Sequence, residues 1–168
     1  KVIGIDVDLR RPSFSRLKIK GHELGLVDYL AEEAELSDVI QVDGSSGAHI
    51  IFSGHKHQNP PDLLGSAAMD KLLKVLSASY EYIVLDAPPV LAVSDARILS
   101  SKVSATLFIV RWADTKREIV VQGLKQIASS GGHLAGVVLS QVDAKNHAGY
   151  GYGDSGSYYG KSAKYYTG

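Results

Sequence analysis

The sequence predicts an α/β fold: a doubly wound, mostly parallel sheet with helices on both faces. Short apolar runs rich in Val and Ile alternate along the chain with longer stretches of helical period, as in strand–helix–strand units. Most of these runs are apolar on both faces, which is typical of central strands in a covered parallel sheet. The 168 residues, 45% of them hydrophobic, suffice for the core of one domain.

Five strands and five helices are predicted. The strands cover residues 2–5, 48–52, 82–85, 105–110 and 134–139, and the helices cover 26–33, 37–41, 62–79, 94–101 and 116–130. The third helix follows Pro60-Pro61 and is expected to begin near Asp62, with an apolar stripe along one side. In such sheets ligands bind beyond the carboxyl ends of the strands, so the residues after each strand are the candidates for chemistry.

Composition excludes several classes of protein. Lys plus Arg equals Asp plus Glu at 18 each, so no nucleic-acid partner is expected from charge. The absence of cysteine excludes disulfides and Cys-based zinc sites. No apolar run approaches the roughly 18 to 20 residues that span a bilayer. The chain has no initiator Met and opens inside a predicted strand at Lys1, so we interpret it as a fragment.

The last part of the chain differs sharply in composition from the rest. From residue 146 to 168 it consists mainly of Gly, Tyr, Ser and Lys, without Leu, Ile or Val. Such a segment buries too little apolar surface to offset the entropy of ordering. We therefore expect a domain over residues 1–145 and a flexible tail over 146–168. Six of the nine tyrosines lie in this tail: Tyr150, Tyr152, Tyr158, Tyr159, Tyr165 and Tyr166.

Two acidic segments follow predicted strands. Asp6 and Asp8 come directly after the first strand and are followed by Arg10. Their carboxylates can face Mg²⁺, which prefers oxygen ligands, or a nucleophilic hydroxyl, and the guanidinium can bind phosphate. The alternative is a charged turn in which the two carboxylates only cap the backbone. Asp86 ends a second apolar strand before Pro88-Pro89, in the form of a Walker B strand whose Asp binds Mg²⁺ directly or through water.

Together these segments resemble the catalytic domain of the bacterial tyrosine kinases, the BY-kinase family. The Asp-x-Asp-x-Arg-Arg-Pro segment at Asp6 is similar to the second Walker A motif (A′) of that family, and residues 82–89 to its Walker B motif. Residues 25–30, 59–66 and 90–96 are similar to the connecting segments, and the tail resembles its tyrosine cluster.

The resemblance implies a P-loop NTPase-like fold of the deviant Walker type and an ATP- and Mg²⁺-dependent protein-tyrosine autokinase. Asp6 and Asp8 would bind Mg²⁺ and orient or deprotonate the tyrosine hydroxyl, and Asp86 would act on Mg²⁺. Arg10 is assigned to phosphate binding or organisation of the site. The six tail tyrosines would accept phosphate.

The family also implies partners and a location. These are a ring of identical subunits that phosphorylate one another, a membrane polysaccharide copolymerase domain or activator protein, and a cognate phosphatase. The location is the cytoplasmic face of the inner or plasma membrane, reached through a fused or separate membrane domain. The function would be control of capsule or exopolysaccharide synthesis and export.

The chain departs from the family pattern at two points. It contains no Gly-x-x-x-x-Gly-Lys-Ser/Thr loop, so the first strand and phosphate loop of the fold are missing and the fragment alone is expected to be inactive. Ser140 stands where relatives carry Asn near the adenine. Two alternatives remain: a deviant-Walker ATPase without tyrosine kinase activity, and a non-catalytic interaction module.

Overall fold

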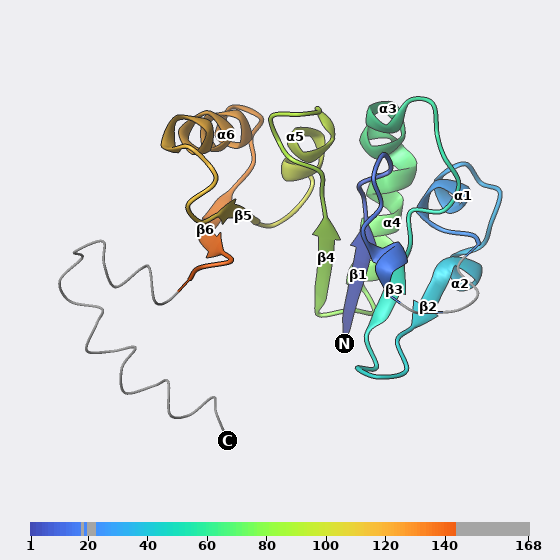
Figure 1. Cartoon of the computed structure of the whole chain (residues 1–168). Coiled ribbons are helices and arrows are strands. Elements are labelled where there is room, and N and C mark those ends of the chain that lie inside the picture. The colour runs from blue at the N-terminus through green and yellow to red at the C-terminus, as the bar shows by residue number, and fades with distance from the viewer. Residues whose placement is uncertain (18, 20–22, 144–168) are drawn as a thin grey trace, which may run out of the picture.

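The computed structural model describes residues 1–17, 19 and 23–143 (Figure 1). The strands are β1 (Val2–Asp6), β2 (Ile40–Val42), β3 (His49–Ile51), β4 (Tyr82–Asp86), β5 (Thr106–Arg111) and β6 (Leu134–Ser140). The helices are α1 (Leu26–Leu30), α2 (Leu36–Val39), α3 (Pro60–Gly65), α4 (Ala67–Ser77), α5 (Asp95–Ser100) and α6 (Arg117–Ser129), with a 3-10 helix η1 (Phe14–Arg16).

The strands form two sheets. Four strands are ordered β2-β3-β1-β4, and β5 pairs with β6 in a second sheet of two. All pairs are parallel except β2–β3. In Figure 1 the β5–β6 pair lies beyond β4, with α5 and α6 above it. Because β1, β3 and β4 run parallel, their carboxyl ends meet at one edge of the larger sheet.

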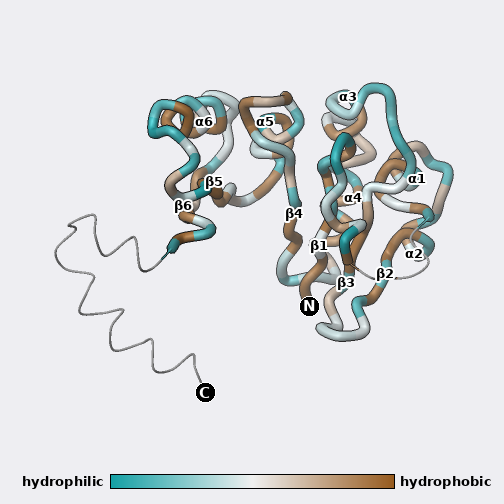
Figure 2. The backbone as a smooth tube through the Cα atoms, in the orientation of Figure 1, coloured by the Kyte–Doolittle hydropathy of each residue, from teal (hydrophilic) through white to brown (hydrophobic). Residues whose placement is uncertain are grey.

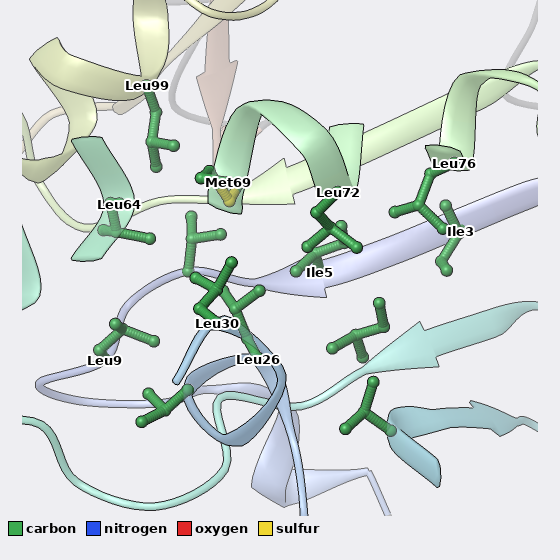
Figure 3. Packing of buried hydrophobic residues seen from close by; sticks show 14 residues of the cluster. Ile3, Ile5, Leu9, Leu26, Leu30, Leu64, Met69, Leu72, Leu76 and Leu99 are labelled. Carbon is green, nitrogen blue, oxygen red and sulfur yellow. The ribbon is translucent and has the colours of Figure 1, made fainter. Parts of the chain in front are cut away.

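The main core lies between one face of the larger sheet and the helices α1 and α4. Ile3 and Ile5 of β1 are fully buried. Figure 3 shows them among apolar side chains of the surrounding helices, which include Leu26, Leu30, Leu64, Met69, Leu72, Leu76 and Leu99. In the hydropathy view of Figure 2 the strands of this sheet are largely hydrophobic. This packing fixes β1, and therefore the position of the acidic residues that follow it.

The predicted α/β class with a mainly parallel sheet is confirmed, and all five predicted strands are present. Three details of the helices differ from the prediction. The expected helix over residues 37–41 ends at Val39, and the chain continues as β2, which pairs antiparallel with β3. The expected single helix over 62–79 is divided into α3 and α4 at Ser66, whose hydroxyl accepts a hydrogen bond from Met69 N. The first of the two helices, α3, begins at Pro60, after the N-cap Asn59, rather than near Asp62.

The opposite face of the larger sheet carries exposed side chains. Val2 alternates with buried residues of β1, and Tyr82 and Val84 alternate with partly buried residues of β4. The three side chains are 44%, 67% and 54% exposed. Phe14 of η1 lies over Gly4 on this face. Within residues 1–17, 19 and 23–143, no helix is both long and apolar enough to cross a bilayer. The predicted tail, 146–168, lies outside the described residues.

Candidate active site

Asp6 and Asp86 end two neighbouring parallel strands in register. Asp6 pairs with Asp86 across β1 and β4, and Val7 N donates a hydrogen bond to the Asp86 carbonyl at 3.0 Å. Neighbouring strands are about 4.8 Å apart, and residues opposite each other in register project from the same face. The structure therefore brings together the two carboxylates that the sequence analysis placed at the ends of separate strands.

Asp6 is fully buried, and its carboxylate holds the loop that follows β1. Oδ1 accepts a hydrogen bond from Asp8 N at 3.2 Å, and Oδ2 accepts one from Phe14 N at 2.8 Å. Burial raises the pKa of Asp6; the backbone hydrogen bonds act in the opposite direction, and the nearby Asp86 charge adds to the rise. A carboxylate in such a position is costly unless it is hydrogen-bonded or meets a cation.

Asp8 organises the next turn with one of its oxygens. Its Oδ1 accepts hydrogen bonds from Arg10 N at 3.2 Å and Arg11 N at 2.9 Å. The capping role that was an alternative for this segment is thus present. Within the described part of the chain, no hydrogen bond involves the second oxygen, Oδ2. Asp8 can therefore hold the turn and still offer an oxygen to a ligand.

Asp86 is exposed and accepts a hydrogen bond from the Ser13 hydroxyl to its Oδ2, at 2.6 Å. This bond joins the loop after β1 to the end of β4 across 73 residues of sequence. Sequence reasoning did not assign Ser13 to the site, because nothing in its local pattern indicates a partner so far away. The neighbouring oxygen of Asp86, Oδ1, takes part in no hydrogen bond with a described residue.

Arg10 extends from the same loop to the start of α5. Its Nε donates to Oδ2 of Asp95 at 3.4 Å; the Arg10 side chain is 43% exposed and that of Asp95 is fully buried. Asp95 lies in the segment 90–96, which is similar to a connecting segment of the family, but its sequence predicted no role for it. Its only sequence signal is an acidic residue in the first turn of a helix.

The donor set of this edge suits magnesium. Three carboxylates, those of Asp6, Asp8 and Asp86, lie on two adjacent strand ends and the loop that follows β1. Across residues 1–17, 19 and 23–143, no three His, Cys, Asp or Glu side chains are close enough to form a metal cluster by themselves. Mg²⁺ is commonly held by one or two carboxylates together with waters and substrate phosphates, so a complete protein cage is not required.

A second charged pair lies after β3, at the same edge of the sheet. The imidazole Nδ1 of His55 is 2.5 Å from Oδ1 of Asp28, and Oδ2 of Asp28 accepts from Gly25 N at 2.7 Å. The Asp28 hydrogen bond and charge raise the pKa of His55. Burial opposes ionisation of Asp28, but the bonds from His55 and Gly25 outweigh it and lower its pKa. His55 is exposed, but this bond to Asp28 anchors it.

Known proteins similar to this chain are bacterial kinases. The chain is 35% identical to the tyrosine-protein kinase etk of Escherichia coli over 152 residues, which are 90% of this chain and 21% of that protein. It is 31% identical to the tyrosine-protein kinase CpsD of Streptococcus agalactiae over 159 residues, which are 94% of this chain and 68% of CpsD. This chain belongs to the bacterial tyrosine-protein kinase family. No family model matches it.

Solved structures of kinase domains from this family have the same fold. The VpsO kinase domain superposes with a TM-score of 0.80 at 32% identity, covering 85% of this chain and 71% of that domain. The kinase domain of Escherichia coli ETK gives a TM-score of 0.82 at 34% identity, with 85% and 56% covered. The Pyrococcus furiosus cell division ATPase MinD, at 20% identity and a TM-score of 0.66, shares the fold. The predicted kinase family and the predicted P-loop NTPase-like fold are confirmed.

The chain spans about one fifth of the length of etk. The family membership therefore describes this region of the protein. The roles of Asp6, Asp8, Asp86 and Arg10 stay predictions, and the six tail tyrosines lie outside the described residues.

Proposed function

We propose that this chain is the catalytic region of an ATP- and Mg²⁺-dependent protein-tyrosine kinase that phosphorylates tyrosines in its own C-terminal tail. The observation that supports it most directly is the in-register pair Asp6 and Asp86, joined by the loop that carries Asp8 and Arg10. Family membership gives the reaction class. The acceptors are the six tyrosines between residues 150 and 166.

The hydrogen bonds of the three carboxylates suggest different tasks for them. Both oxygens of Asp6 accept backbone N–H groups, so Asp6 mainly holds the loop in place. Asp8 and Asp86 each have one oxygen committed to the loop. The remaining oxygen of Asp86 would hold the metal ion of Mg-ATP, directly or through water, and that of Asp8 would face the tyrosine hydroxyl. When bound, Mg²⁺ neutralises charge on the phosphates.

Phosphoryl transfer depends mostly on positioning and on charge neutralisation. Asp8 is half-buried, and its Oδ2 would accept the proton of the incoming tyrosine hydroxyl. Arg10 would place its guanidinium against a phosphate, where the planar fork allows two parallel hydrogen bonds. Arg10 and Arg11 of this loop are exposed, so a tyrosine of another chain can approach them.

The proposed setting follows from the family. Copies of the protein would form a ring and phosphorylate one another, beside a fused or separate membrane polysaccharide copolymerase or activator at the cytoplasmic face of the membrane. A cognate phosphatase would remove the phosphate. Each phosphate adds about −1.5 to −2 charges, so a multiply phosphorylated tail would repel neighbouring tails. This cycle would control capsule or exopolysaccharide synthesis and export.

The test is phosphotyrosine mass spectrometry of the full-length protein after incubation with Mg-ATP. Asp8→Asn and Asp86→Asn are suitable variants, because an Asn oxygen can still accept the bonds that Asp8 and Asp86 accept from the loop. We expect phosphate on the tail of the wild type and at least a roughly hundredfold lower rate in each variant. Asp70→Asn is the control, since Asp70 pairs with Lys102 and lies outside the site.

Two results would contradict the proposal. An unmodified tail in a protein that still hydrolyses ATP would identify a deviant-Walker ATPase. A full-length protein that neither binds nor hydrolyses ATP would favour the non-catalytic interaction module. The 168-residue chain alone, which contains no phosphate loop sequence, is expected to be inactive in the same assay.

A further inference from the structure

Asp95 is a buried carboxylate with an incomplete set of partners. Its side chain is fully excluded from solvent at the start of α5. Oδ2 accepts the hydrogen bond from Arg10 Nε, and Oδ1 has no hydrogen-bond partner among the residues that the structure describes. A buried carboxylate with a single ionic partner weakens the folded state more than an apolar residue of similar size would. Its presence needs an explanation other than stability.

Helix capping does not supply that explanation. Asp95 lies in the first turn of α5, where an acidic residue commonly accepts a backbone N–H. Here the N-cap Ser94 makes no side-chain cap bond. The hydrogen bonds described for the Asp95 side chain come from Arg10 alone. The carboxylate is therefore directed to the loop after β1, 85 residues away in sequence, and not to its own helix.

Arg10 is held at two points and remains free at its end. Its backbone N–H donates to Asp8 Oδ1, and its side-chain Nε donates to Asp95. For the two terminal nitrogens of its guanidinium, no bond is found within residues 1–17, 19 and 23–143. A guanidinium fixed through Nε keeps those nitrogens as donors of known orientation for a planar anion.

We propose that Asp95 is a positioning residue that holds the Arg10 guanidinium for the phosphates of ATP. This rests on the proposed function, because it assigns a task to Arg10 in the same site. Asp95 touches neither nucleotide nor tyrosine; it acts through Arg10. A long Arg side chain loses several rotamers when it binds phosphate, and a partner that has already restricted it lowers this cost.

The experiment is equilibrium titration of the full-length protein with Mg-ATP, using Asp95→Asn, Arg10→Gln and the double variant. Residues that orient a ligand-binding group typically matter by about 10- to 100-fold. We expect the Kd for Mg-ATP to rise by that factor in each single variant. It should rise no further in the double variant, since all three variants lose the same contact, that of the Arg10 guanidinium with the phosphates. Asp95→Glu, which restores the charge, should recover part of the affinity.

Asp70→Asn is the matched control, because Asp70 also lies in the first turn of a helix and pairs with a basic side chain, Lys102. It should leave the Kd unchanged. The proposal is overturned if Asp95→Asn binds Mg-ATP as the wild type does, or if the losses in Asp95→Asn and Arg10→Gln multiply in the double variant. A lower melting temperature with unchanged affinity would likewise assign Asp95 to structure alone.

The titration separates this inference from the proposed function. A wild type that binds Mg-ATP but leaves its tyrosines unmodified contradicts the kinase proposal, while the affinities of the variants still decide the role of Asp95. A wild type that phosphorylates its tail while Asp95→Asn keeps full affinity retains the kinase and overturns the inference. A wild type without affinity for Mg-ATP overturns both.

Discussion

Asp6 and Asp8 illustrate how an observed capping task and the proposed chemical task can share one short segment. Asp6 uses both oxygens to hold backbone amides, and Asp8 uses one. The turn that results places Arg10 against Asp95 and Ser13 against Asp86. The capping and the chemical interpretations of this sequence are therefore compatible, because a site of this kind requires a rigid loop.

Gly54 offers a sharp test of the contact between the loop after β3 and α1. Its φ is +78°, and a Cβ there would overlap the Asp28 carboxylate and the Gly25 backbone. We expect Gly54→Ala to lower the free energy of unfolding by about 3 kcal/mol or more, from backbone strain and overlap together. Gly47→Ala is the control, since its φ is +71° with open space around it. It should cost only about 1–2 kcal/mol in urea unfolding.

His55 makes the stability of this loop depend on pH. Its pKa is raised in the folded state, so its contribution is complete below about 6.5, the unfolded value, and is lost as pH rises through the folded value. The Asp28 pKa is lowered, so the contribution of Asp28 is lost only in acid. We expect His55→Gln to destabilise the protein more at pH 5.5 than at pH 9.

Urea unfolding at the two pH values measures this difference. His57→Gln is the control, because the His57 imidazole accepts a hydrogen bond from Asn59 N and forms no ion pair with a described residue. An equal effect of His55→Gln at both pH values would show that the ion pair adds nothing to stability.

Residue by residue, the sequence predicted one part of the site and missed another. Asp6 and Asp86 were found because an acid at the carboxyl end of an apolar strand is a local pattern. Ser13 and Asp95 were missed because their contacts, with Asp86 and Arg10, join segments 73 and 85 residues apart. Such contacts depend on how the loops close over the sheet, which strand and helix periodicity does not encode.

At the level of elements, the strands were predicted more accurately than the helix ends. Buried runs of Val and Ile mark the parallel strands clearly, whereas β2 is a three-residue edge strand, too short to show a period. The division between α3 and α4 had a local signal, because Gly65 precedes Ser66, a favourable N-cap residue. The long apolar stripe that continues through both helices obscured it.

Ser66 should therefore be important for α4. Its hydroxyl accepts the Met69 N–H at 3.3 Å, which satisfies one of the free amides of the first turn. We expect Ser66→Ala to reduce the free energy of unfolding by about 1 kcal/mol and Ser66→Asp to retain most of it. Ser77→Ala is the control near the end of the same helix, where the hydroxyl donates to the Lys74 carbonyl. It should change stability by less than about 0.5 kcal/mol. Equal losses in the two Ala variants, measured by urea unfolding, would exclude a capping role.

At the scale of the whole molecule, the strands form two separate sheets, and the division lies between β4 and β5. β4 borders the larger sheet and β5 borders the smaller one, so each has a side without a strand partner in the described residues. Val84, Leu107 and Ile109 on these strands are 54%, 56% and 65% exposed. Apolar edge strands of this kind promote association with other chains.

We predict that sequence outside these 168 residues supplies a further parallel strand between β4 and β5. It would pair with both free edges and cover part of this apolar surface, and it would join the two sheets into one. The expected result is that the 168-residue chain binds a hydrophobic dye and associates in gel filtration, whereas the full-length protein does so much less per domain. In the short chain, Ile109→Thr should reduce dye binding, and Val75→Thr, on the exposed side of α4, should not. Two results together would contradict the prediction: equal dye binding per domain in the two proteins, and equally fast solvent exchange of the β4 and β5 amides in both. They would show that no strand occupies this position and that the two sheets are separate in the native protein.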